Sequence, residues 1–431
     1  MRFSRRLFPT TAATAALALL ATAPLAAGGF SVFEQGSKAM GMAGAFTAQA
    51  DDPSALFHNV GGLGFFEERD IALGVTLVTS TDESFVGAPP GFATGSTASI
   101  SSLAEPVPHF YWVQPTGRSW NFGLAVNAPF GLKTEWENPD AFAGRFINTE
   151  ASMLVLDVNP NFGVKLTDNF GIGFGLIARF SKIELNRRQA TTNPFTGGLA
   201  EFAAVRLESD MDQGLGWQLG LLHRYNPSFS WGFSYRSNLT VDYGGNAVFT
   251  QIPTGTPQLD AILAATIPFG QNLPVTTAIE FPDTASLGVA MALGPESLLE
   301  IDVNWAGWSS FDALRVDFTG NPAFDFERRE NWKDVYNYRL GLRFGRGSGS
   351  EWLLGFVMDE SPQPTASVSP LLPDADRNGY TAGWSREGGG VDLDLAVMYL
   401  DFAARTVDNS IDMFNGTYSQ TGWLFAATLG F

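Results

Sequence analysis

The chain ends in the stretch Trp423-Leu424-Phe425-Ala426-Ala427-Thr428-Leu429-Gly430-Phe431. Counted back from Phe431, every second side chain as far as Trp423 is apolar. This alternation is typical of a β-strand with one face in an apolar solvent. Together with a secretory start, an apolar final strand that ends on an aromatic residue favours a transmembrane β-barrel in a bacterial outer membrane.

The beginning of the chain has the features of a secretory signal. Three arginines in the first six residues precede an Ala/Leu-rich run at 11–20, and the small residues Ala26 and Ala27 offer a cleavage site. Residues 1–27 are therefore predicted to be a signal peptide. A transmembrane helix is the alternative, but the apolar run is shorter than the ~20 residues that a membrane span needs.

Composition excludes several classes of protein. There is no cysteine, so the chain has neither disulfides nor thiolate metal sites. The formal charge is −18, and removal of the three signal-peptide arginines gives −21 for the mature protein. This acidic excess argues against nucleic acid as a partner. The 47 glycines and 13% aromatic residues are typical of a protein with many strands, tight turns and aromatic rings at the membrane interface.

The mature chain divides into about fourteen strand-like segments and therefore predicts an all-β fold, an antiparallel transmembrane barrel. The predicted strands are 69–78, 108–115, 119–128, 153–165, 170–185, 213–225, 229–243, 280–293, 297–306, 334–345, 350–360, 379–386, 390–402 and 420–431. Short turns such as 116–118 and 226–228 alternate with long connections such as 129–152 and 244–279. Short periplasmic turns and long external loops are typical of outer-membrane barrels, whereas a soluble sandwich has no reason for this asymmetry.

The alternation also predicts which side chains face the lumen. Asp157, Asp392 and Asp394 fall on the face opposite the apolar residues, where they avoid lipid. The same face carries apolar side chains such as Ile177 and Leu424. A partly apolar lumen suits a hydrophobic solute better than a sugar or an ion, although such residues also suit packing against a plug.

Residues 28–68 do not have the pattern of strands. A small-residue run at 39–50 leads to Asp51-Asp52-Pro53-Ser54, which predicts the start of a helix of about two turns that Asn59 and the following glycines end. We expect this segment to fold into the lumen as a plug, or hatch. The predicted organisation is thus a signal peptide at 1–27, a hatch of short helices at 28–68 and a transmembrane barrel at 69–431.

Several motifs along the mature chain resemble those of one family, the outer-membrane transporters of long-chain fatty acids and other hydrophobic compounds (the FadL and TodX family). The order of the motifs over the whole mature chain carries the resemblance, and no single motif is specific. The matching stretches are Ala50-Asp51-Asp52-Pro53-Ser54 with Asn59, Pro129-Phe130-Gly131-Leu132-Lys133-Thr134-Glu135, Asp157-Val158-Asn159-Pro160, Gly232-Phe233-Ser234-Tyr235-Arg236-Ser237, Pro282-Asp283-Thr284-Ala285-Ser286-Leu287, Trp308-Ser309-Ser310-Phe311, Asn331-Trp332-Lys333-Asp334, Asp359-Glu360-Ser361-Pro362 and Leu372-Pro373-Asp374-Ala375-Asp376-Arg377.

The resemblance implies a fourteen-stranded barrel with an N-terminal hatch and a passive route of uptake. In that route the ligand is captured near the external loops, moves to an inner site and leaves sideways through a gap in the barrel wall. The chain departs from the family at Asn59-Val60-Gly61, where the family has Asn-Pro-Ala. This departure leaves open the path of the hatch.

The resemblance also implies where a ligand binds. A basic residue is expected on the strand that contains Arg179, and a second near Arg328 and Lys333, so these residues are candidates to hold a carboxylate head group. The alternative is that these cations balance lumen carboxylates such as Asp157. Phe30, Phe33 and Ile177 are candidate contacts for an apolar tail.

The external loops offer candidate capture residues. Phe130, Leu132 and Trp136 lie close together in one loop, and a short amphipathic helix is predicted at 257–267 in another. Exposed apolar patches of this kind often bind ligands, and self-packing of a long loop is the alternative.

No catalytic, metal or cofactor site is predicted. The three histidines have no ligand spacing, and no Gly-x-Ser-x-Gly nucleophile elbow is present in the sequence. The best reading is a non-enzymatic, monomeric outer-membrane channel for long-chain fatty acids or similar compounds, in contact with lipid and lipopolysaccharide. The alternatives are a general diffusion porin, an outer-membrane lipid hydrolase and a structural barrel. An alkane, an aromatic hydrocarbon or a signalling lipid would also suit the lumen, and its cations favour a carboxylate.

Overall fold

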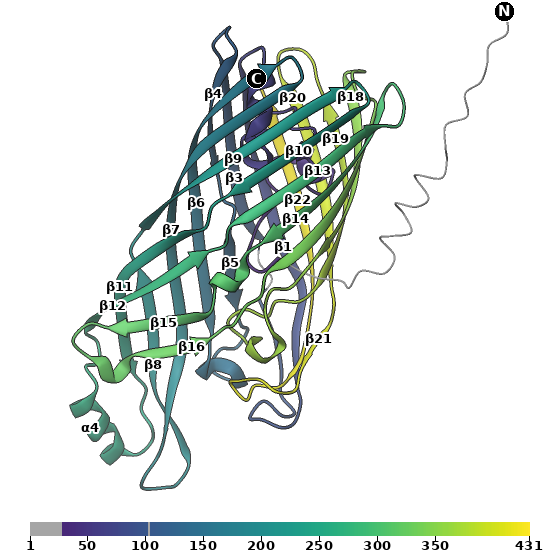
Figure 1. The fold of residues 1–431 in the computed structure, drawn as a ribbon. Helices are drawn as coiled ribbons and strands as arrows, with labels where there is room; N and C mark the ends of the chain where they lie inside the picture. The colour runs from purple at the N-terminus through teal and green to yellow at the C-terminus, as the bar shows by residue number, and fades with distance from the viewer. Residues whose placement is uncertain (1–27, 102–103) are drawn as a thin grey trace, which may run out of the picture.

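The computed structural model describes residues 28–101 and 104–431. The predicted signal peptide, residues 1–27, lies outside the described residues. The chain forms a closed antiparallel barrel of fourteen strands (Figure 1), as the sequence predicts. In order around the wall the strands are β1 (Asp70–Gly87), β3 (Ala104–Pro115), β4 (Trp120–Asn127), β6 (Glu150–Thr167), β7 (Phe170–Thr192), β9 (Asp212–Asn226), β10 (Phe229–Arg236), β13 (Thr284–Ala292), β14 (Ser297–Ala306), β17 (Val335–Phe344), β18 (Ser350–Asp359), β19 (Arg377–Arg386), β20 (Asp392–Phe402) and β22 (Gly416–Gly430).

The terminal strand β22 closes the barrel against β1. Ala72 lies opposite Gly430 and Leu77 lies opposite Phe425 in this ladder. The side chain of Phe425 is 49% exposed on the outer face, whereas its neighbour Leu424 is 2% exposed on the lumen side. The alternation in the sequence therefore separates lipid-facing from lumen-facing residues.

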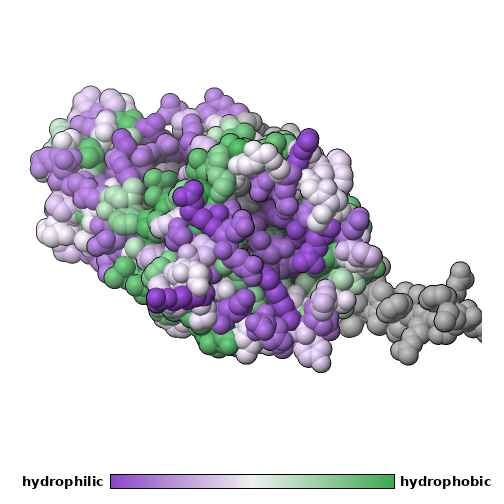
Figure 2. All heavy atoms as spheres, turned by 90° about the horizontal axis from the view of Figure 1, so that it is seen from above, coloured by the Kyte–Doolittle hydropathy of each residue, from purple (hydrophilic) through white to green (hydrophobic). Residues whose placement is uncertain are grey.

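The two ends of the barrel differ in their connections (Figure 1). Short turns join β3 to β4, β6 to β7 and β9 to β10 at the end that carries the C-terminus. Seen from that end, hydrophilic side chains predominate around the middle of the molecule (Figure 2). The long connections lie at the opposite end, which is the external end in outer-membrane barrels.

The external end is extended by further strands and short helices. They are β2 (Thr97–Ser99), β5 (Gly131–Glu135), η3 (Ala143–Phe146), β8 (Leu199–Ser209), β11 (Leu239–Gln251), α4 (Pro257–Thr266), β12 (Asn272–Phe281), η4 (Trp308–Ser310), β15 (Ala313–Phe318), η5 (Pro322–Phe324), β16 (Phe326–Arg329), η6 (Thr365–Ser367) and β21 (Arg405–Val407). The helix α4 forms where the sequence predicts it, with Leu259 and Leu263 buried and Ile262 exposed.

Two predicted strands are broken in the structure. The segment 229–243 divides into β10 and β11, and the segment 280–293 divides into β12 and β13. At the second break Pro282 has no N–H to donate to a ladder. At the first, the backbone N–H of Ser237 donates to Trp217 O at 2.9 Å, and its hydroxyl accepts from Trp217 N at 3.0 Å. Beyond these breaks β11 pairs with β8 rather than with a wall strand.

The segment that follows residue 27 packs inside the barrel. It contains α2 (Ser37–Gly41), α3 (Ala55–His58) and η2 (Val60–Phe65). The helix α3 is a single turn, shorter than predicted, because Asn59 redirects the chain. The Asn59 amide donates to Thr47 O at 2.7 Å and to Leu221 O at 2.9 Å, and it accepts from Gly61 N at 3.0 Å. No helix in the described part of the chain has the length and apolarity needed to cross a bilayer.

Glycines on the lumen face of the wall allow this close packing. A Cβ atom at Gly173 of β7 would lie 2.1 Å from Val60 O, and one at Gly232 of β10 would lie 2.0 Å from Thr47 O. Both distances are far inside van der Waals contact. Glycine on the strands therefore lets the backbone of the inner segment lie against the wall.

Buried polar contacts hold the inner segment to the wall. Asp302 of β14 accepts from the backbone N–H groups of Phe46 and Thr47 at 3.1 and 3.0 Å. Arg343 of β17 pairs with Asp51 at 2.7 Å and with Glu351 at 2.8 Å. Burial alone would raise the pKa of Asp51, but Arg343 and Lys38 hold that pKa below its usual range.

Candidate functional site

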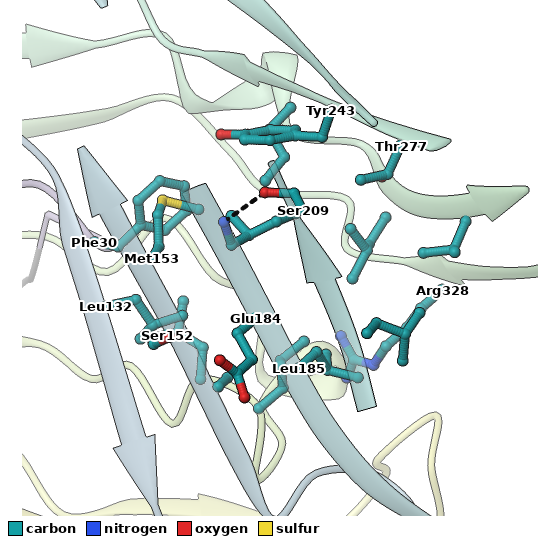
Figure 3. Close-up of a pocket in the computed structure, with 18 of the residues that line it drawn as sticks. Phe30, Leu132, Ser152, Met153, Glu184, Leu185, Ser209, Tyr243, Thr277 and Arg328 are labelled. Carbon is teal, nitrogen blue, oxygen red and sulfur yellow. Dashed lines mark hydrogen bonds between the residues drawn. The ribbon is translucent and has the colours of Figure 1, made fainter. Parts of the chain in front are cut away.

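An apolar cavity lies where the wall meets the external extension. The empty space between its lining residues is about 940 Å³, including solvent at its mouth. In Figure 3 it runs from Phe30 and Met153 on one side to Arg328 on the other, with Tyr243 and Thr277 above. Its apolar lining consists of Phe30, Leu132, Ala151, Met153, Ile183, Leu185, Leu207, Val275, Ile279, Phe311, Leu314, Val316, Phe326, Trp332, Leu371 and Leu372. Such a lining stabilises a ligand by about 0.8 kcal/mol for each buried methylene.

A second space, the side cavity, lies next to the apolar cavity. Its open volume is about 1930 Å³, and residues of β1, β3, β5, β6 and β22 line it. Phe30, Leu132, Met153 and Leu372 line both cavities. These side chains therefore stand between the two spaces, and their positions decide whether a ligand can pass from one to the other.

The side cavity reaches an interruption in the barrel wall. The ladder between β3 and β4 covers 110–115 and 121–126. Beyond it β5 pairs with β6, and no pairing between β5 and β3 occurs in the described ranges. The interruption is called the wall gap below. Across it the Lys133 ammonium lies 2.8 Å from Glu105 Oε1, and this ion pair is largely exposed.

The start of the inner segment is fixed beside this gap. Val32 N donates to Pro129 O at 2.8 Å, and Gly131 N donates to Phe30 O at 3.0 Å. The Phe30 ring then lies edge to face with Trp308, with 4.6 Å between the ring centroids, and 5.6 Å from the Trp332 ring. The break between β4 and β5 thus provides the backbone partners that place Phe30 between the cavities.

Arg179 points into the lumen, as its strand parity predicts, and is already neutralised. Its guanidinium donates two hydrogen bonds to Asp157, both of 2.8 Å, and both residues are buried. The centroids of the Phe130 and Phe281 rings both lie 4.5 Å from the guanidinium carbon and 5.0 Å from each other. Ile177 belongs to the same buried cluster. Arg179 is therefore engaged with Asp157, which is the alternative that the sequence left open.

The structure does not bring Arg328 and Lys333 together with Arg179. Arg328 lines the apolar cavity and pairs with Glu330 and Asp412. The Lys333 side chain is 58% exposed, and its ammonium lies 3.6 Å from Glu360.

The remaining candidate residues occupy three different places. Phe130 and Leu132 line the side cavity. Phe33 packs in the hatch, with the Arg339 guanidinium 4.1 Å above its ring. Trp136 is 2% exposed, stacks on Phe142 of its own loop and donates to Pro370 O of another loop at 2.9 Å, so it packs between external loops. The hatch candidates Asp51, Asp52 and Asn59 all make internal contacts, and Asp52 accepts from the Ser54 N–H at 2.7 Å.

Two important residues were missed by the sequence reasoning. Glu330 directly precedes the motif Asn331-Trp332-Lys333-Asp334 and Trp332 lies within it, but neither was singled out as a site residue; both are buried beside Arg328 and the apolar cavity. The Trp332 indole donates to Glu330 at 3.2 Å. The signal that was available is an acidic and an aromatic residue on either side of Asn331, which has a φ of 51° and turns the chain back.

Comparison with known proteins identifies the family to which this chain is similar. The profile of a family described as outer membrane protein transport protein (OMPP1/FadL/TodX) matches residues 17–431. The chain belongs to this family. It is thus an outer-membrane transport protein for hydrophobic compounds and not an enzyme.

Individual relatives agree with the family assignment. The chain is 23% identical to the long-chain fatty acid transport protein of Salmonella typhi over 99% of both chains. It is 24% identical to a 47 kDa outer membrane protein of Pasteurella multocida over 87% of both.

Solved structures share the fold. A Pseudomonas aeruginosa FadL homologue matches with a TM-score of 0.78 and 18% identity, over 94% of this chain and 99% of that one. The Pseudomonas putida toluene transporter TodX matches with a TM-score of 0.70 and 17% identity, over 93% and 99% of the two chains.

Proposed function

We propose that this protein takes up hydrophobic compounds passively and releases them sideways into the membrane. The external end captures the compound, the apolar cavity holds it, and movement of Phe30 admits it to the side cavity. It then leaves through the wall gap. The observation that carries the proposal is that the two cavities share Phe30 and that the second of them reaches the gap.

A polar floor supports lateral release over passage to the periplasm. Below the cavities the lumen contains the hatch, which we assign to residues 28–68, inside a barrel at 69–431. Its contacts with Asp302 and Arg343 are buried and polar. An apolar compound that entered this layer would leave these polar groups without hydrogen-bond partners, at a cost of about 1–3 kcal/mol for each group. The wall gap is crossed by the Lys133–Glu105 ion pair, and this pair is largely exposed rather than buried.

A filled lumen disfavours the alternative of a general diffusion porin. The hatch residues from Gln35 to Val60 are almost all buried against the wall. We expect no steady ion conductance in planar bilayers, whereas an open lumen would conduct. Monomeric state and contact with lipopolysaccharide remain predictions of the sequence.

Closing the wall gap tests the route. The chain has no cysteine, so Glu105→Cys with Lys133→Cys places the only two thiols across the gap. A short bis-maleimide that joins them should stop uptake of a labelled hydrocarbon into cells. The matched control is Thr406→Cys with Thr417→Cys, which joins the paired strands β21 and β22. Uptake that continues at full rate with the gap cross-linked would contradict lateral release.

A further inference from the structure

Arg328 is the only cation among the described residues that line the apolar cavity. Its guanidinium donates to Glu330, to Asp412 at 2.7 Å and to Ser367 O at 2.8 Å. Glu330 is 2% exposed and also accepts from the Trp332 indole. Two carboxylates thus surround one guanidinium, and no net positive charge is left for a ligand.

The cations of the side cavity are paired in the same way. Lys133 pairs with Glu105, Lys182 lies 2.5 Å from Glu208, and Arg377 lies 2.6 Å from Asp359. Arg179 lines neither cavity among the described residues, and its guanidinium is taken up by Asp157 and two aromatic rings. Both spaces that a ligand would cross therefore lack a free positive charge in the described part of the chain.

This arrangement penalises one class of ligand. A carboxylate that entered the apolar cavity would lose its hydration and meet Arg328 with Glu330 and Asp412 already bound. A buried charge without a partner is strongly disfavoured in a low-dielectric space. An uncharged compound with the same alkyl chain buries the same apolar surface without this penalty.

We propose that the apolar cavity selects uncharged compounds, hydrocarbons and neutral amphiphiles, over carboxylates of equal chain length. Glu330 and Asp412 determine this specificity because they neutralise Arg328. The inference rests on the proposed uptake function and names its substrate class. It reverses the expectation that lumen cations favour a carboxylate.

Binding of 1-decanol and decanoate to the purified full-length protein in detergent tests the proposal. The two ligands have nearly equal chains, and at about pH 8 decanoate is ionised. Equilibrium dialysis should show decanol binding at least about tenfold tighter, or about 1.4 kcal/mol. Equal affinity, or tighter binding of decanoate, would overturn the charge preference and leave the uptake function standing. If neither ligand binds, both proposals fail.

Substitution of Glu330 tests the specificity determinant. Glu330→Gln keeps the shape of the side chain and leaves Arg328 with one carboxylate, so decanoate affinity should rise severalfold while decanol affinity stays the same. The control is Glu327→Gln on β16, three residues before Glu330, whose carboxylate pairs with Arg315 and lies outside both cavities. If Glu330→Gln does not fold, Asp412→Asn removes the other partner of Arg328. Unchanged decanoate affinity in the folded variant would exclude control by these carboxylates.

Discussion

Two parts of the lumen are packed in different ways. They are the hatch half, which the hatch fills, and the cavity half, which contains the apolar cavity and the side cavity. In the hatch half, glycines bring backbone against backbone, and buried ion pairs such as Arg343 with Asp51 hold the contact. In the cavity half, large apolar side chains leave space between them, and Phe30 rests among aromatic rings. Buried polar pairs fix one geometry, whereas aromatic contacts can be exchanged for a ligand at little cost. Directional polar contacts thus fix the geometry of the hatch half, which seals the barrel. No such contacts fix the cavity half, which holds the ligand.

The largest effect is expected at the boundary between these halves. Asp157→Ala would leave Arg179 buried without its bidentate partner, and Arg236, 3.8 Å from Asp157, would lose its nearby carboxylate. Breaking a buried pair in this way costs about 3–5 kcal/mol of stability. Urea unfolding in detergent should show the loss. Asp140→Ala is the control, because its pair with Arg188 leaves Asp140 84% exposed, and it should change stability by no more than about 1 kcal/mol.

A bulkier residue in the hatch half should lower the stability of the protein by less than Asp157→Ala does. Its effect should be confined to the hatch. Gly173→Val places methyl groups where Val60 O already lies 2.1 Å from the Cβ position, so the hatch has to shift. Overpacking of this kind costs about 1–3 kcal/mol. Limited proteolysis should show earlier cleavage within 28–68 while the barrel stays intact. Gly244→Ala, where a Cβ meets nothing within 4 Å, should behave like the wild type.

Acid should remove the contribution of His58 to the stability of the hatch half. Burial lowers the pKa of His58 to about 3, although its hydrogen bond to Gln35 O opposes the shift. The undocked imidazole has a pKa of about 6.5, so the docked hatch is at full stability above this pH. As the pH falls below it, the contribution of His58 to docking should fall by about 1.4 kcal/mol per pH unit.

Hydrogen exchange of the hatch amides between about pH 7 and pH 5 would measure this loss. Burial raises the pKa of Asp52 in the same segment to about 7, so Asp52 opposes this loss over the same range, and the wild type is compared with His58→Gln. As the pH falls, the variant should gain protection relative to the wild type. An equal pH dependence in the two proteins would show that His58 does not couple docking to pH.

The smallest effect on stability is expected at the wall gap. Lys133 and Glu105 form a largely exposed ion pair, and such pairs contribute about 0–1 kcal/mol. Lys133→Met should leave unfolding nearly unchanged yet raise uptake, because nothing then joins the two edges. Arg315→Met serves as the comparison, since its exposed pair with Glu327 lies outside both cavities. A large loss of stability in Lys133→Met would mean that the pair holds the wall together.

The sequence predicts the parts of this molecule that repeat and misses those that depend on distant partners. Alternation along 423–431 and the short turns predict the barrel, because side-chain parity is a local property. The same parity places Arg179 in the lumen, and Asp157 is a foreseen partner. The breaks after Arg236 and Phe281 were not predicted, since apolar alternation continues through both. The pairing of Arg328 with Asp412 joins loops 84 residues apart and has no local signal.

The wall gap has a further consequence, for the folding of the barrel and its behaviour among other chains. A closed barrel normally offers no strand edge, yet here β3 presents one within the membrane wall. Its exposed stretch contains Pro106 and Pro108, which carry no N–H. A strand that lacks two donors in so short a run is a poor template for another strand. The prolines therefore disfavour strand pairing across the gap during assembly. They also disfavour the addition of a strand from a neighbouring protein.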